Sequence, residues 1–107
     1  MQNQNVEATL IQTPARTYYI NNSEGKSALT YFNSAYEKAN QGDAQNAILE
    51  LDEAIKLDDS FAEAYFNRGL LKLLVEDMTA ISDLSKAGEL GIYSAYNIIK
   101  KHQKKKK

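Results

Sequence analysis

Apolar residues recur at helical spacing along the chain from Ser27 onward. They fall three or four positions apart, as on one face of an amphipathic helix. Ser27 and Asp43 stand where each can cap the start of a helix, and Gly42 and Gly91 stand where helices end. The pattern predicts an all-α domain. The expected helices span residues 28–40, 44–57, 62–75, 79–90 and roughly 92–102.

The first 26 residues lack this periodicity. They are rich in Asn, Gln, Thr and Ser, although Val6, Leu10 and Ile11 could form one short apolar face. Residues 17–20 are β-formers in a row. Two interpretations stay open: the segment 1–26 is flexible or loosely docked, or it packs on the domain as a short strand or helix. Such a segment could also occupy the groove of its own domain.

The helical pattern occurs twice in the chain. At an offset of 34 residues Tyr31 matches Tyr65 and Phe32 matches Phe66, and after Asp77 the offset falls to 33. The matched residues are mostly those predicted to face inward, which a chance repeat would not select. A fixed period of this length is typical of repeats built from helical hairpins. The further identities are Ala28/Ala62, Asn33/Asn67, Lys38/Lys72, Asp43/Asp77, Ala47/Ala80, Ile48/Ile81, Leu51/Leu84, Ala54/Ala87 and Leu57/Leu90.

These residues resemble the tetratricopeptide repeat (TPR) family. Tyr31 stands at the usual Trp position, Ala35 at the small position and Gly42 at the turn. Asp59 stands where Pro is common, and the ending at residues 87–91 resembles the related Sel1-like variant. The resemblance implies a short α-solenoid of two antiparallel helix–turn–helix repeats plus a C-terminal capping helix. The repeats would span residues 28–61 and 62–91, and the capping helix 92–102, within a domain of residues 27–102.

In the family that the sequence resembles, the first helix of each repeat lines a concave groove. Asn33 and Asn67 are the most informative pair, since a side-chain amide both donates and accepts and can therefore pair with a peptide backbone. The alternative is that Phe32 and Phe66 belong to the core and that the two asparagines satisfy local backbone groups. The alignment gives ten groove candidates: Leu29, Phe32, Asn33, Tyr36, Asn40, Glu63, Phe66, Asn67, Leu70 and Leu74.

The net charge of −1 conceals a split. Residues 100–107 hold six of the 13 basic residues, which leaves 7 basic and 14 acidic residues, a net charge of −7, on the rest of the chain. There is no Cys, and the single His lies in the basic end, so we expect no catalytic residue, no metal site and no cofactor. Gly25-Lys26-Ser27 lacks the first glycine of a phosphate-binding loop. The acids Glu50, Asp52, Glu53, Asp58, Asp59 and Glu63 are interpreted as a solvated face and turn.

The sequence therefore predicts a non-enzymatic interaction module that binds a peptide or protein segment. One alternative is that Lys100–Lys107, including a disordered basic tail at 103–107, binds nucleic acid or anionic lipid. Another is a homodimer that forms through the open face of the first hairpin. The amide-rich start of the chain does not resemble a signal peptide, and the expected location is cytoplasmic.

Overall fold

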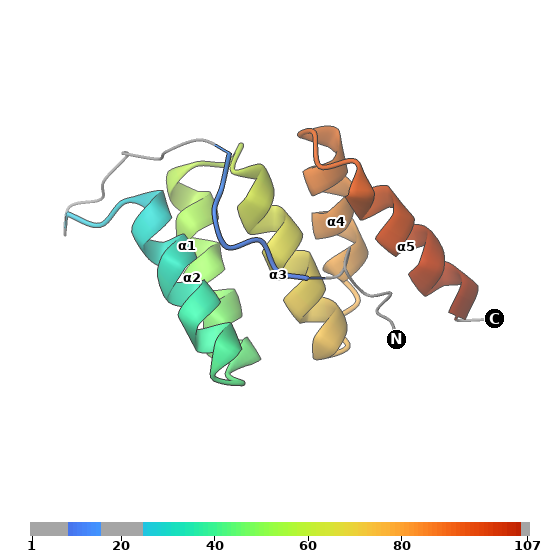
Figure 1. The fold of residues 1–107 in the computed structure, drawn as a ribbon, viewed down its shortest axis with the longest axis horizontal. Helices are drawn as coiled ribbons and strands as arrows, with labels where there is room; N and C mark the ends of the chain where they lie inside the picture. Colours follow the sequence, from blue (N-terminus) through green and yellow to red (C-terminus); the bar gives the residue numbers. More distant parts are fainter. Residues whose placement is uncertain (1–8, 16–24, 106–107) are drawn as a thin grey trace.

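The computed structural model describes residues 9–15 and 25–105. This part of the chain contains five helices and no strand. Each helix packs against the next one along the chain, and Figure 1 shows them side by side in chain order. The predicted all-helical class is thus confirmed for the described residues. The helices are α1 (Ala28–Asn40), α2 (Ala44–Leu57), α3 (Ala62–Leu74), α4 (Ala80–Glu89) and α5 (Ser94–Lys105).

The predicted caps of the first hairpin are confirmed. The Ser27 side chain accepts from the backbone N–H of Thr30, and the Thr30 side chain accepts from the N–H of Ser27, which makes a capping box. Asp43 accepts from the backbone N–H of Asn46 and so caps α2. Gly42 lies between the two helices with φ 83°, a conformation that glycine adopts without steric cost.

The turn between α3 and α4 repeats this geometry without a glycine. Glu76 stands one repeat after Gly42 and has φ 61°. The N–H of Asp77 donates to the Lys72 carbonyl over 2.8 Å, and the N–H of Asp43 donates to the Lys38 carbonyl over 2.9 Å. Equivalent positions of the sequence repeat therefore carry equivalent turns.

The boundary of the last helix differs from the prediction. Helix α5 begins at Ser94 and continues to Lys105, whereas the sequence analysis placed it at 92–102 and expected a disordered tail from 103. Gly91, with φ 116°, and the bond from the Ile92 N–H to the Ala87 carbonyl hold residues 91 and 92 in the preceding turn. Lysine is a good helix former and its charge suits a helix C-terminus, so the helix continues into the basic residues. Residues 106 and 107 lie outside the described residues.

The core consists of two clusters that meet at α3. The first joins α1 and α2 to α3 through residues such as Ala64 and Leu71, and the second joins α3 to α4 and α5 through Phe66 and Leu70. Small residues allow the close approach: a Cβ on Gly69 would lie only 2.7 Å from the Leu84 Cγ. Helix α3 is therefore the central element, packed on one side by α2 and on the other by α4.

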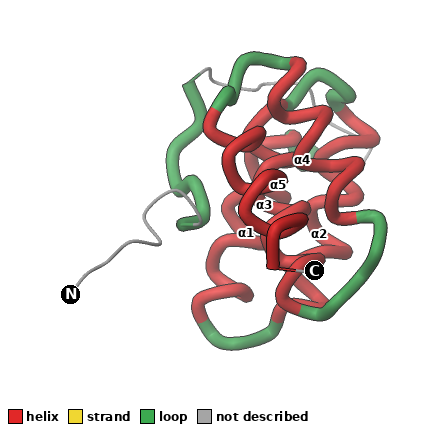
Figure 2. Tube along the Cα trace, turned by 90° about the vertical axis from the view of Figure 1, so that its right-hand side faces the viewer, coloured by secondary structure: helices red, strands yellow, loops and turns green. Residues whose placement is uncertain are grey.

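Residues 9–15 lie against the helices as a non-helical segment. Leu10 and Ile11 pack against both core clusters. Figure 2 shows the segment on the side of the helix array where α1 and α3 lie, opposite α2. The rest of the predicted N-terminal segment, residues 1–8 and 16–24, lies outside the described residues.

Candidate functional site

The side chain of Asn67 in α3 holds the backbone of Ile11 at two points. The Ile11 N–H donates to Asn67 Oδ1 over 2.8 Å, and Asn67 Nδ2 donates to the Ile11 carbonyl over 2.8 Å. Asn67 is only 2% exposed, so its amide would be costly to leave without partners, by about 1–3 kcal/mol. The two bonds use both the donor and the acceptor of the amide and both polar groups of one backbone residue. Asn67 therefore pairs with the backbone of the chain's own residue 11 through both of its polar groups.

Glu63 makes a second backbone contact one helical turn earlier on α3. Its Oε2 accepts from the Ala15 N–H over 3.1 Å, and the residue is 9% exposed. Because residue 11 lies at Asn67 and residue 15 at Glu63, the segment runs opposite to α3. Four residues of extended chain would span about 13 Å, whereas four residues of helix rise about 6 Å. The segment accordingly bends at Gln12 and Thr13, both of which are exposed.

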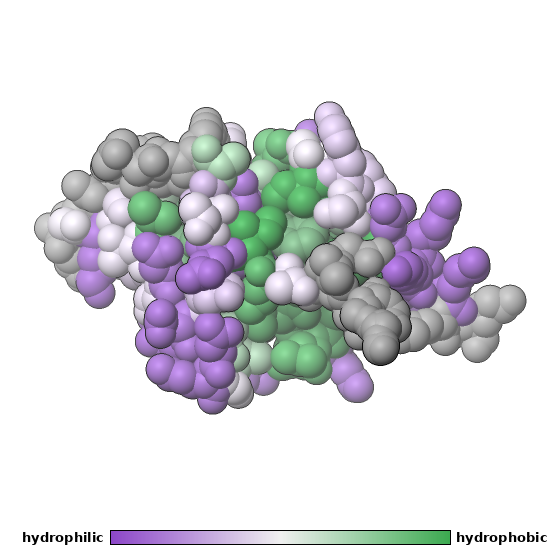
Figure 3. Space-filling view, viewed as in Figure 1, coloured by the Kyte–Doolittle hydropathy of each residue, from purple (hydrophilic) through white to green (hydrophobic). Residues whose placement is uncertain are grey.

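The apolar part of the site is the surface between the two core clusters. Phe66 and Leu70 belong to the second cluster, and Leu29 packs against the first. Leu10 and Ile11 close this surface from the solvent side, since each packs against both clusters. In Figure 3 an apolar band is visible over the middle of the molecule, between α1 and α5. We call the surface of α3 covered by residues 9–15 the groove.

The first repeat contributes less to the groove than the second. Asn33, the repeat counterpart of Asn67, is exposed, as is Asn40, and Tyr36 is half-buried. Phe32 is corrected from a groove residue to a core residue: it is 0% exposed and stacks on Phe61 with ring centroids 4.9 Å apart.

Among the candidates of the second repeat, Glu63 and Asn67 meet the bound segment through hydrogen bonds. Phe66 and Leu70 are corrected to core residues as well: they are 2% and 9% exposed, in the cluster against which Leu10 and Ile11 pack. Leu74 is 72% exposed at the end of α3. The acidic face predicted from the sequence is also corrected at Glu63, which is buried because residues 9–15 cover its part of α3.

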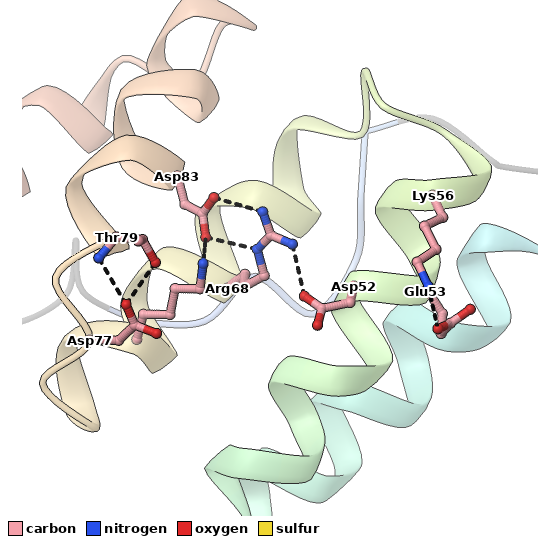
Figure 4. Close-up of polar contacts among 8 residues, drawn as sticks. Asp52, Glu53, Lys56, Arg68, Asp77, Thr79 and Asp83 are labelled. Carbon is pink, nitrogen blue, oxygen red and sulfur yellow. Dashed lines mark hydrogen bonds and ion pairs between the residues drawn. The ribbon is translucent and has the colours of Figure 1, made fainter.

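Sequence reasoning missed an ion-pair cluster around Arg68, drawn in Figure 4. Arg68 donates to both carboxylate oxygens of Asp83 in α4 and to Asp52 in α2, each over 2.8 Å. Lys72 lies 3.1 Å from the same Asp83 carboxylate, whose side chain is 7% exposed. The one available signal was that Arg68 is the single Arg after residue 16 and lies mid-helix beside inward-facing residues. Its acidic partners lie 15 and 16 positions away in sequence, so helical spacing could not identify them.

The acidic neighbours of Arg68 keep its guanidinium charged. The hydrogen bonds that Arg68 donates to Asp83 outweigh the opposing effect of burial and raise the pKa of Arg68 above its already high ordinary value. Arg68 therefore stays charged and ties α2, α3 and α4 together. The cluster is structural, since each of its charges faces another charge across a contact between helices.

A surface hollow of about 850 Å³ lies along α2 and includes Arg68 in its wall. Its charged residues pair with one another: Lys38 lies 3.2 Å from Glu50, and Lys56 lies 3.2 Å from Glu53. The lining carries four basic residues and three acidic ones, so its charge is nearly balanced: Lys26, Lys38, Lys56 and Arg68 against Glu50, Asp52 and Glu53. The described residues also contain no group of three or more acidic, His or Cys side chains able to hold a metal ion. No helix in the same part of the chain combines the length and apolar character needed to cross a membrane.

Comparisons of the chain with protein-family models, with curated proteins and with solved structures give no match. The features of this chain that bear on its function are the sequence repeat and the contacts of residues 9–15 with α3.

Proposed function

We propose that this chain is a non-enzymatic protein-interaction module that binds a peptide or protein segment in the groove across α3. The observation that carries the proposal is the pair of 2.8 Å hydrogen bonds between Asn67 and the backbone of Ile11. A surface that holds one segment by its backbone and by aliphatic side chains has the chemistry to hold another. Peptide recognition of this kind combines backbone hydrogen bonds for affinity with side-chain pockets for specificity.

The proposal includes the finer fold that the TPR resemblance implies, a short α-solenoid of two antiparallel hairpins and a capping helix. Equivalent positions of the repeat have equivalent burial, which supports it: Leu51 and Leu84 are both 0% exposed, as are Ala54 and Ala87. Each helix packs on its chain neighbour, as in a solenoid. In such an arrangement α5 acts as the cap that covers the second hairpin.

The partner in this proposal is a protein or peptide, and the proposed location is the cytoplasm. Nucleic acid and anionic lipid are less favoured as partners than a protein or peptide. The basic residues that would bind them lie at the end of α5, and residues 1–99, with a net charge of −7, would repel an anionic partner. A homodimer through the first hairpin is less favoured as well, since the groove contacts involve α3 and the chain's own residues 9–15.

The test is a selection of displayed 12-residue peptides on the full chain carrying Leu10→Asp and Ile11→Asp. These substitutions place charges where the segment needs apolar contact and so release it from the groove. Selected peptides are then measured against the same chain with Asn67→Ala, and against a matched control with Asn33→Ala. We expect binders that lose affinity with Asn67→Ala and keep it with Asn33→Ala. If every selected peptide binds equally well to all three chains, the proposed function is wrong.

A further inference from the structure

The contacts of residues 9–15 have the form of a ligand bound at a defined register. One residue, Ile11, gives both its N–H and its C=O to Asn67, and the N–H four positions later goes to Glu63. A shift of the segment by one residue would move both backbone groups away from Asn67 and would exchange the buried and exposed side chains. The groove therefore distinguishes sequences by position.

The pattern of exposure shows which positions of the segment the groove selects. Leu10 and Ile11 are half-buried against the two core clusters, whereas Gln12 and Thr13 are exposed. Pro14 is partly buried and its ring fixes the local backbone next to the bend. Ala15 is exposed and contributes its N–H, which a proline at that position could not donate.

We propose that the groove is specific for segments with two adjacent aliphatic residues, two polar residues of any kind, a proline and then a residue with a backbone N–H. Residues 9–15, which have this pattern, then act as a tethered competitor for the same site. The inference rests on the proposed function and names the chemistry of the partner and the control of access to it. The partner segment runs opposite to α3 and needs no charge of its own, because the groove reads its backbone.

The tether sets the size of the competition. A segment attached by a short connection has an effective concentration of about 1 mM at its own site. If the docked segment has an intrinsic dissociation constant of about 0.1 mM, a free peptide of the same sequence binds the unsubstituted chain roughly tenfold more weakly than a chain with an empty groove. Release of the segment is thus measurable as a gain in affinity.

The experiment uses a fluorescein-labelled peptide with the sequence of residues 6–16, VEATLIQTPAR, and fluorescence anisotropy. The proteins are the full unsubstituted chain and the full chain with Leu10→Asp and Ile11→Asp, with helix content checked by circular dichroism. We expect roughly tenfold tighter binding to the substituted chain. Equal binding of the peptide to the two chains would show that residues 9–15 do not compete for the groove. No binding to either chain would show that the groove does not select this sequence pattern.

Changes in the peptide test the register without altering the fold of the protein. N-methylation at Ile11 removes the N–H that donates to Asn67, and replacement of Ala15 by proline removes the N–H that donates to Glu63. Each change is expected to weaken binding about tenfold, and a peptide of reversed sequence is expected not to bind. N-methylation at Gln12, which is exposed, is the matched control and is expected to change binding less than twofold. Retained affinity in the Ile11-methylated peptide would contradict the assigned register.

A second measurement covers the case in which the doubly substituted chain does not fold. Excess unlabelled peptide is titrated into the unsubstituted ¹⁵N-labelled chain, and the backbone amide signals of Ile11 and Ala15 are followed. Displacement of the tethered segment moves both signals, and unmoved signals at saturation overturn the competitor. If displayed peptides of other patterns bind through Asn67 while the peptide of residues 6–16 does not, the proposed sequence specificity is wrong and the proposed function stands. If no peptide depends on Asn67, both are wrong.

Discussion

The turn between α3 and α4 carries a conformational strain that a single substitution would remove. Glu76 has φ 61°, in the left-handed region, at the position where the first hairpin has Gly42 with φ 83°. Both turns are otherwise alike: the N–H of Glu76 donates to the Leu73 carbonyl over 3.1 Å, and the N–H of Gly42 donates to the Ala39 carbonyl over 3.0 Å. We therefore predict that Glu76→Gly stabilises the protein.

The expected size follows from two opposing terms. A residue with a Cβ pays roughly 1–2 kcal/mol to adopt the left-handed conformation, and glycine does not. Glycine instead loses more backbone entropy on folding, about 0.5–1 kcal/mol. The Glu76 side chain is exposed, so its removal sacrifices little packing. The net expectation is a gain of about 0.5–1 kcal/mol in the free energy of unfolding.

Urea unfolding followed by circular dichroism measures this gain. With a urea dependence of about 1 kcal/mol per molar, the unfolding midpoint should rise by about 0.5–1 M. The melting temperature should rise by roughly 2–8 °C for a domain of this size. The control is Glu76→Ala, which removes the same carboxylate and keeps the Cβ, and which we expect to leave the midpoint almost unchanged. An equal gain in Glu76→Ala would assign the effect to charge, and no gain in Glu76→Gly would refute the strain argument.

Three further predictions concern the core, the ion-pair cluster and the caps. Gly69→Ala should lower the free energy of unfolding in a urea titration, by about 1–3 kcal/mol, because the new Cβ would lie 2.7 Å from the Leu84 Cγ; an unchanged or higher midpoint would contradict the close approach of α3 and α4. Arg68→Ala should lower the free energy of unfolding by about 3 kcal/mol in the same assay, because the buried Asp83 carboxylate would keep only Lys72 as a partner. Asp52→Ala, which removes the more exposed partner in α2, should lower it by about 1 kcal/mol or less. Equal losses in the two variants would be evidence against a buried cluster. Hydrogen bonds from Asn46 lower the pKa of Asp43, so its stabilising contribution is complete above pH about 4 and is lost as the pH falls through the lowered pKa. Melting temperatures measured from pH 7 to pH 2 should show this loss, and Asp43→Asn, which keeps a capping side chain, should reduce it; an unchanged acid dependence in that variant would assign the loss to other groups.

The helices and caps followed from the sequence because they depend on near neighbours. The predicted bounds of the first two helices match the structure, since Ser27, Gly42 and Asp43 decide those ends within a few residues. The predicted start of α3 at Ala62 also matches, and the other ends of α3, α4 and α5 moved by one to three residues. Thr79 makes no side-chain cap bond, so no capping side chain marks the start of α4.

The site was predictable only as a set of positions. The repeat identified Asn33 and Asn67 together, but the structure gives a partner to Asn67 from a residue 56 positions away. Periodicity says nothing of contacts at that distance. The same limit concealed the Arg68 cluster, whose members come from three helices, and it left Phe32 as a groove candidate although the ring stacks in the core.

The two buried polar sites of α3 differ in what happens when a partner leaves. Loss of Arg68 would strand the Asp83 carboxylate, whose side chain is 7% exposed and held between helices, so that cluster favours a permanent arrangement. Asn67 pairs with the backbone of Ile11, and where departure of the segment exposes the amide, water satisfies the same donor and acceptor. Exchange of one segment for another at Asn67 therefore leaves no buried group unpaired. In the proposed function this difference would favour reversible binding at Asn67, while the neighbouring residue Arg68 keeps α2, α3 and α4 together.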